Sequence, residues 1–188
     1  MLDVGCGYGR WAHLLKSNYW EANMAQPPTI DGVDAFGPNV EHCRASGVYR
    51  RVWEQLLPGE LHGTWDTVLA CEIIEHIPQE SVEETLDLLE SVARRRVIIS
   101  TPNYHYLRDG ADTVLGFNDH EAHLSYSPRS FFRQRGYTVV GAGFGNPNHW
   151  LVRLLVRLFQ HRAKFGFQSL PVFWPATAAC IVAFKNVN

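Results

Sequence analysis

Short apolar runs alternate with stretches of helical periodicity over the first half of this chain. Such alternation predicts a parallel, doubly wound α/β sheet, because each helix carries the chain back to begin the next strand in the same direction. The strongest run, "WDTVLACE", is apolar at most positions, as expected for a strand buried on both faces. Sheets of this class bind ligands beyond the carboxyl ends of their strands. The predicted strands occupy residues 2–4, 29–36, 49–53, 65–72 and 95–100, and the predicted helices lie around residues 11–15, 38–45 and 82–93.

The last third of the chain has a different pattern. Residues 137–144 and 177–184 are predicted to be two further strands, separated by the helix-like segment 148–160. Residues 103–128 form a connection that is too long for an ordinary turn, and such connections commonly form lids or substrate-binding walls. We expect residues 1–188 to form a single domain.

Composition limits the classes of function. A formal net charge of −2 gives no global basic footprint, so a nucleic-acid partner is not expected. The four cysteines are far apart and form no C-x-x-C pair, which favours reduced thiols in a cytoplasmic protein over a zinc site or a disulfide framework. The longest apolar run, residues 170–184, is shorter than the ~20 residues of a spanning helix, so no transmembrane segment is expected. The sequence leaves the oligomeric state open.

Three glycines at every second position follow the first predicted strand, in "LDVGCGYG". Glycines there let the backbone turn sharply and approach a ligand, and the helix that follows offers free N–H groups. The dinucleotide fingerprint G-x-G-x-x-G is not met, because Arg10 stands at the sixth position counted from Gly5. This mismatch argues against a nicotinamide oxidoreductase. Asp3, just before the loop, would suit a cationic ligand.

A second acid, Asp34, ends the next predicted strand, on the order of 20 residues beyond the loop, where a carboxylate can accept hydrogen bonds from ribose hydroxyls. Asp34 fits this role better than Asp31, because Val33 precedes it within the strand.

Two segments, "LDVGCGYG" and "WDTVLACEIIEHIP", together resemble motifs of the class I S-adenosylmethionine-dependent methyltransferases, in particular the methyltransferase type 11 and ubiquinone-pathway O-methyltransferase groups. The resemblance implies a Rossmann-like, mostly parallel seven-stranded sheet whose last strand is antiparallel. In relatives, a helix and the front of the first strand lie upstream, so we expect this chain to begin inside its central strand, either because its recorded start is late or because it is truncated.

The resemblance also implies which residues hold S-adenosyl-L-methionine. In the family, the acid at the Asp3 position helps to hold the methionine amino group. Relatives often use an acid after the third strand for the adenine amino group, and here either Glu54 or Gln55 would serve. The other implied cofactor-binding residues are Gly5, Cys6, Gly7, Gly9, Asp34, Ala35 and Cys71.

The segment "CEIIEHIP" offers two carboxylates and an imidazole. If it is helical, Glu72, Glu75 and His76 share one face and can supply half the shell of a divalent cation. The pattern is similar to ubiquinone-pathway O-methyltransferases and small-RNA 2′-O-methyltransferases, where it is associated with metal and with a downstream histidine, here His120 or His123. The alternative, which we prefer, is a metal-free segment whose histidine fixes the local backbone.

The expected reaction is methyl transfer to a small-molecule acceptor at a hydroxyl oxygen. A hydroxyl is a poor nucleophile at neutral pH, so His76, His120 or His123 would act as general base. The competing hypothesis is a non-catalytic or truncated methyltransferase fold that serves as a binding module. The apolar segment 150–164 carries interspersed arginines, which would suit either peripheral contact with a membrane or a helix packed across the sheet.

Overall fold

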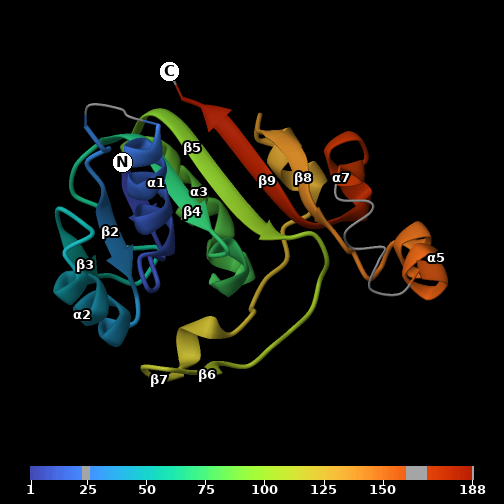
Figure 1. Cartoon of the computed structure of the whole chain (residues 1–188), viewed down its shortest axis with the longest axis horizontal. Coiled ribbons are helices and arrows are strands. Elements are labelled where there is room, and N and C mark those ends of the chain that lie inside the picture. The colour runs from blue at the N-terminus through green and yellow to red at the C-terminus, as the bar shows by residue number, and fades with distance from the viewer. Residues whose placement is uncertain (23–25, 160–168, 188) are drawn as a thin grey trace.

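The computed structural model describes residues 1–22, 26–159 and 169–187. Its centre is a seven-stranded sheet with the order β3-β2-β1-β4-β5-β9-β8 (Figure 1). β9 pairs antiparallel with both β5 and β8, and the other described pairings in this sheet are parallel. The prediction of a mostly parallel sheet with an antiparallel last strand is therefore confirmed. The strands are β1 Leu2–Val4, β2 Asp31–Asp34, β3 Val52–Glu54, β4 Trp65–Cys71, β5 Ala93–Pro102, β8 Thr138–Phe144 and β9 Ala178–Asn186.

Helices cover both faces of the sheet (Figure 1). On one face, Ala12 and Cys43 pack in an apolar cluster with Ile30 and Tyr49. On the other face, Leu86 and the neighbouring apolar residues of α3 pack with Phe132 of α4 against the central strands. The helices are α1 Arg10–Glu21, α2 Gly37–Ser46, α3 Val82–Val92, α4 Arg129–Gln134, α5 Trp150–Phe159 and α7 Leu170–Phe173.

The short strand β1 lies inside the sheet, between β2 and β4, and aligns these two neighbours. Leu2 lies opposite both Asp31 and Val68, and Val4 lies opposite both Val33 and Ala70. Leu2 and Val4 are almost completely buried, and burial of each such side chain stabilises the fold by roughly 1.5–3 kcal/mol. Because these strands run in register and in the same direction, β1, β2 and β4 all end at one edge of the sheet.

The long connection 103–128 contains a small hairpin of β6 Ala111–Thr113 and β7 Gly116–Asn118, which the sequence did not predict. The hairpin lies beyond the carboxyl edge of the sheet (Figure 1). Main-chain bonds tie the end of this connection to the sheet, because the N–H groups of Leu124 and Ser125 both donate to the carbonyl of Glu75. The connection is therefore positioned as a cover over the strand ends.

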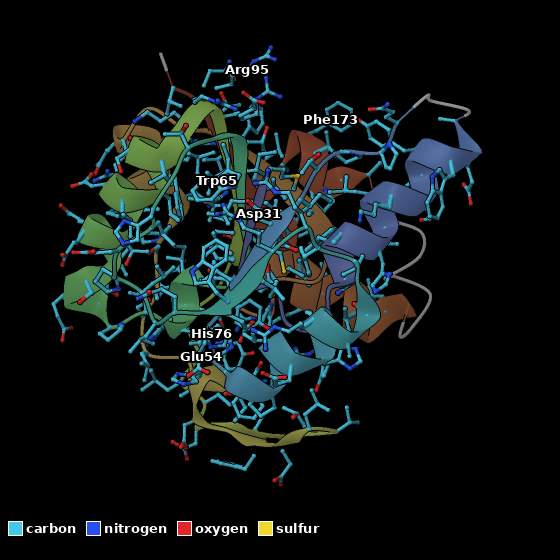
Figure 2. All side chains as sticks on the ribbon, turned by 90° about the vertical axis from the view of Figure 1, so that its left-hand side faces the viewer. Asp31, Glu54, Trp65, His76, Arg95 and Phe173 are labelled. Atoms are coloured by element: carbon cyan, nitrogen blue, oxygen red, sulfur yellow. The ribbon has the colours of Figure 1, made fainter. Side chains whose placement is uncertain are left out.

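The opposite, amino end of the sheet is closed by a cluster around Asp31. The Oδ1 atom of this carboxylate accepts from Arg50 Nε at 2.8 Å, and Oδ2 accepts from Arg51 Nη2 and from Trp65 Nε1, each at 2.8 Å. Figure 2 shows Asp31 beside Trp65, whereas His76 lies nearer the hairpin. Although burial alone would raise it, these hydrogen bonds hold the pKa of Asp31 well below its ordinary value.

Candidate active site

A cavity of about 470 Å³ lies at the carboxyl edge of the sheet. Its lining joins the glycine loop and the end of β2 to the segment after β4 and to the covering connection. Gly5, Gly7 and Asp34 lie on the first side, and Glu75, His76 and His123 lie on the second. The topology therefore brings both predicted halves of a site into a single space.

The glycine loop takes backbone conformations that other residues rarely adopt. Gly5 and Gly7 have φ values of +66° and +52°. A Cβ on Gly5 would lie 1.7 Å from Ile73 Cδ1, whereas a Cβ on Gly7 would meet no atom within 4 Å. The first glycine is thus needed for packing against the segment after β4, and the second leaves backbone open to the cavity. Helix α1 begins directly after Gly9.

Asp34 is held at the cavity wall by its own loop. Its Oδ1 accepts from Phe36 N at 2.9 Å and from Asn39 Nδ2 at 3.2 Å. Its Oδ2 accepts from Gly7 N at 2.8 Å. Since each carboxylate oxygen has about two lone-pair sites, Oδ2 keeps capacity for a further donor. Asp34 lines the cavity and Asp31 does not. The role of Asp34 in binding ribose hydroxyls stays a prediction.

The other predicted cofactor-binding residues divide into two groups. Asp3, Gly9 and Glu54 are not part of the cavity lining. A Cβ on Gly37 would lie 2.8 Å from Glu54 Oε2, so this carboxylate faces the start of α2. Of the alternative pair, it is Gln55 that lines the cavity. Those that do line it are Gly5, Cys6, Gly7, Asp34, Ala35, Gln55 and Cys71.

Asp3 lies buried on the α1–α2 face of the sheet. Tyr49 Oη donates to its Oδ2 at 2.6 Å. Its Oδ1 is buried and has no hydrogen-bond partner among the residues that the structure describes. Burial raises the pKa of Asp3 to about 6 even though the bond from Tyr49 opposes the shift. A carboxylate in this state is suited to a cationic group, which would satisfy Oδ1 and lower the pKa.

The expected helical face at residues 72–76 is not formed. Glu72 has a φ of +56°, and only Ile74–His76 forms a single 3₁₀ turn. The left-handed residue interrupts helical geometry, so Glu72 does not share a helix face with Glu75 and His76. Instead, both carboxylates turn to β5: Ser100 Oγ donates to Glu72 Oε1 at 2.7 Å, and Thr101 Oγ1 donates to Glu75 Oε2 at 3.0 Å.

His76 and His123 meet across the cavity wall. Their rings are 4.9 Å apart in an edge-to-face arrangement. His76 Nδ1 donates to the carbonyl of Ala122 at 2.9 Å, so in the neutral ring the lone pair is on Nε2. Burial lowers the pKa of His76, and burial together with His76 lowers the pKa of His123 to about 4. Both imidazoles are therefore neutral near pH 7 and able to accept a proton or bind a cation.

One set of side chains here could hold a metal ion. One ligand atom from each of Glu75, His76 and His123 lies within 4.8 Å of the other two. His123 thus stands where Glu72 was expected in the predicted metal set. Burial and the neighbouring charge of Glu72 raise the pKa of Glu75 to about 8, so this side chain holds a proton near neutral pH, and a bound cation would displace it. A carboxylate with two imidazoles, one fixed through its other nitrogen, fits a divalent metal.

Sequence reasoning missed Arg108, which lines the cavity and positions the covering connection. Its guanidinium pairs with Glu121 at 3.0 Å, and its backbone carbonyl accepts from the N–H of His123 at 2.8 Å. Tyr106, which also lines the cavity, has its ring centroid 4.4 Å from that of His123. The role of Arg108 arises from contacts between distant residues and leaves no local pattern.

Comparisons with known proteins agree with this geometry. A family model described as a methyltransferase domain matches residues 1–141. The ubiquinone biosynthesis O-methyltransferase of Methylococcus capsulatus is 36% identical over 81 residues, which cover 41% of this chain and 32% of that enzyme's length. The match thus spans only about a third of the curated relative.

Solved structures share the fold at low identity. Magnesium protoporphyrin IX methyltransferase from Synechocystis PCC 6803, solved with bound S-adenosylmethionine, superposes with a TM-score of 0.56 at 15% identity, over 100% of this chain and 69% of that one. Coclaurine N-methyltransferase, bound to N-methylheliamine and S-adenosylhomocysteine, gives a TM-score of 0.53 at 16% identity, over 98% of this chain and 66% of that one.

Proposed function

The chain belongs to the methyltransferase domain family, and from this premise we propose that it transfers the methyl group of S-adenosyl-L-methionine to a hydroxyl oxygen of a small molecule. The supporting observation is the single cavity that joins the glycine loop and Asp34 to a pair of neutral histidines. A cavity that only bound a nucleoside would not need the two histidines.

The glycine-loop side of the cavity would bind the cofactor. Asp34 Oδ2 has capacity for the ribose hydroxyls. Asp3 lies behind the cavity lining, and its unpaired Oδ1 would pair with the methionine amino group as the glycine loop adjusts to the cofactor. Gln55 would lie beside the adenine, with Cys6, Ala35 and Cys71 contributing wall. When bound, S-adenosyl-L-methionine supplies a methyl group that is already activated by its sulfonium charge. The protein's task is therefore to align the two reactants and exclude water.

The histidine side would bind and deprotonate the acceptor. Nε2 of His76 is the basic atom of the neutral ring, and the Ala122 carbonyl would stabilise the charged ring after proton transfer. His123 packs edge-to-face against this ring and provides the second candidate base. The curated relative is an O-methyltransferase, which supports oxygen as the atom methylated.

A divalent metal at Glu75, His76 and His123 is a second candidate feature, favoured by the mutual distances of their ligand atoms. A metal bound there would lower the pKa of the acceptor hydroxyl. Titration calorimetry with Mg²⁺ and Mn²⁺ should detect binding to the wild-type protein and to Glu83→Ala on exposed α3, and no binding to Glu75→Ala. If none of the three proteins takes up an ion, the site is metal-free and the histidines act as bases.

The main proposal is tested in two steps. Calorimetry should detect binding of S-adenosyl-L-methionine and S-adenosylhomocysteine but not of NADH. Incubation of the protein with the labelled methyl donor and a metabolite extract, followed by mass spectrometry, should then identify a methyl ether. The variant His76→Ala should lower the rate of labelling by about 10²–10⁴-fold with unchanged cofactor affinity.

Each unfavourable outcome points to a specific alternative. Cofactor binding without any labelled product supports a non-catalytic binding module. A labelled methylamine keeps methyl transfer but moves the acceptor atom to nitrogen. Failure to bind either sulfur nucleoside contradicts the proposal as a whole.

A further inference from the structure

An unusual surface lies at the end of the molecule formed by α5 and α7, beyond the edge strand β8 (Figure 1). The inner side of α5 is packed, with Val152 against Phe144 and with Leu170 of α7 close by. The ring of His149 lies 4.9 Å from that of Trp174 and also links the two helices. Both helices nevertheless expose large apolar side chains. We call the following set the α5–α7 surface: Trp150, Leu154, Leu158, Val172, Phe173 and Trp174.

The outer side of α5 also carries large apolar side chains. Trp150, Leu154 and Leu158 recur every fourth residue, which places them on one stripe of the helix, and they are 59%, 44% and 64% exposed. Phe173 of α7 is 85% exposed, and Figure 2 shows it at the periphery of the molecule. Contiguous exposed apolar groups of this kind mark a site of interaction.

The charges on these two helices have one sign, because neither α5 nor α7 contains an acid. Arg153 and Arg157 are exposed and lie along one side of the apolar stripe, each directly before one of its leucines in the sequence. A second copy of the chain, docking through the same surface, would bring these arginines together without an acid to pair them. The partner that fits this surface has an apolar interior and a negatively charged outer surface.

We propose that the α5–α7 surface docks the protein on an anionic lipid bilayer. The apolar side chains enter the boundary between head groups and acyl chains, the tryptophans lie at that interface, and Arg153 and Arg157 contact lipid phosphates. Among the described parts of the chain, no helix is long and apolar enough to cross a bilayer. The inference does not depend on the proposed methyl transfer.

Sedimentation with lipid vesicles tests the proposal. The full chain should pellet with vesicles of equal parts phosphatidylcholine and phosphatidylglycerol, and much less with phosphatidylcholine alone. Because each arginine near an anionic surface changes the partition by about fivefold, Arg153→Gln and Arg157→Gln should each weaken binding by that factor. High salt should weaken wild-type binding in the same direction.

Apolar variants supply the matched control. Leu158→Glu and Phe173→Glu should each reduce pelleting by at least about tenfold, because an apolar side chain would no longer enter the interface. Trp20→Glu, at a 67% exposed position on α1, should bind like the wild type. Circular dichroism and an unchanged melting temperature show that the variants are folded.

Three results would overturn the proposal. The first is a wild-type protein that stays in the supernatant with anionic vesicles. The second is equal pelleting of Leu158→Glu, Phe173→Glu and wild type. The third is a surface that serves another partner: dimerisation abolished by Leu158→Glu, or tight binding of a single-stranded RNA oligonucleotide, in either case without vesicle binding.

Discussion

Buried acids at the two ends of the parallel sheet differ in their hydrogen-bond partners and in the direction of their pKa shifts. At the amino end, Asp31 accepts hydrogen bonds from Arg50, Arg51 and Trp65, and these bonds hold its pKa below the ordinary value. At the carboxyl end, Glu75 accepts a hydrogen bond from Thr101 but has no cationic partner among the described residues, and burial raises its pKa to about 8.

This difference distinguishes acids that support the fold from acids that are available to a ligand. A buried carboxylate that is fully paired contributes to the native state, whereas one left without a cation is unfavourable until a partner arrives. Asp3 and Asp34, which also lie near the carboxyl end, keep oxygens with free capacity. The comparison predicts that substitution of Asp31 will mainly lower stability, whereas substitution of Asp34, at the other end of β2, will mainly lower cofactor affinity.

The largest expected effect is the loss of stability in Asp31→Ala. Removing this carboxylate leaves the buried Trp65 N–H without its partner and the two arginines without their counter-charge. Because the arginine side chains are about half exposed and can turn to water, we expect a cost of about 3 kcal/mol in the free energy of unfolding. Urea unfolding measures it. Cofactor affinity should be unchanged, and a loss of affinity larger than the loss of stability would contradict the division between the two ends.

Asp34→Ala should lose little stability and much of its affinity for the cofactor. The donors that it frees, Gly7 N, Phe36 N and Asn39 Nδ2, adjoin a cavity that water can enter, so we expect a loss of only about 1 kcal/mol in the free energy of unfolding. The affinity for S-adenosyl-L-methionine should fall by about 100-fold, because hydrogen bonds to a charged acceptor are worth about 1.5–3 kcal/mol. Calorimetry at neutral pH checks this. An unchanged affinity would show that Asp34 is structural, like Asp31.

What could be predicted from the sequence follows from how local each feature is. The glycine loop and Asp34 belong to short strand–turn–helix units, and their spacing alone brings them to one edge of the sheet. The pairing of His76 with His123 depends on how residues 103–128 cross that edge, which no local pattern specifies. The single left-handed residue Glu72 replaced an expected helix, because turning the chain away from β4 took precedence over helical periodicity. The partner of Asp3, Tyr49, comes from another strand connection and was equally invisible.

The protonation of Asp3 is expected to affect both the stability of the fold and the affinity for the cofactor. In the free protein its pKa is raised to about 6, so the proton is bound more tightly in the folded than in the unfolded state. The contribution of Asp3 to stability is therefore most favourable at low pH, and it is lost as the pH rises from the unfolded pKa through about 6. An ionised Asp3 is the form that pairs with the methionine ammonium group. Cofactor affinity should therefore rise by about tenfold between pH 5 and pH 7 and then level off, as the ionised fraction does for a pKa near 6.

Asp3→Asn keeps an acceptor for Tyr49 but cannot ionise, so its affinity should be flat over this range and its stability above pH 6 should exceed that of the wild type. Calorimetry and urea unfolding at several pH values measure both. If Asp3→Asn retains the wild-type pH dependence of affinity, Asp3 belongs with Asp31 among the acids that serve the fold.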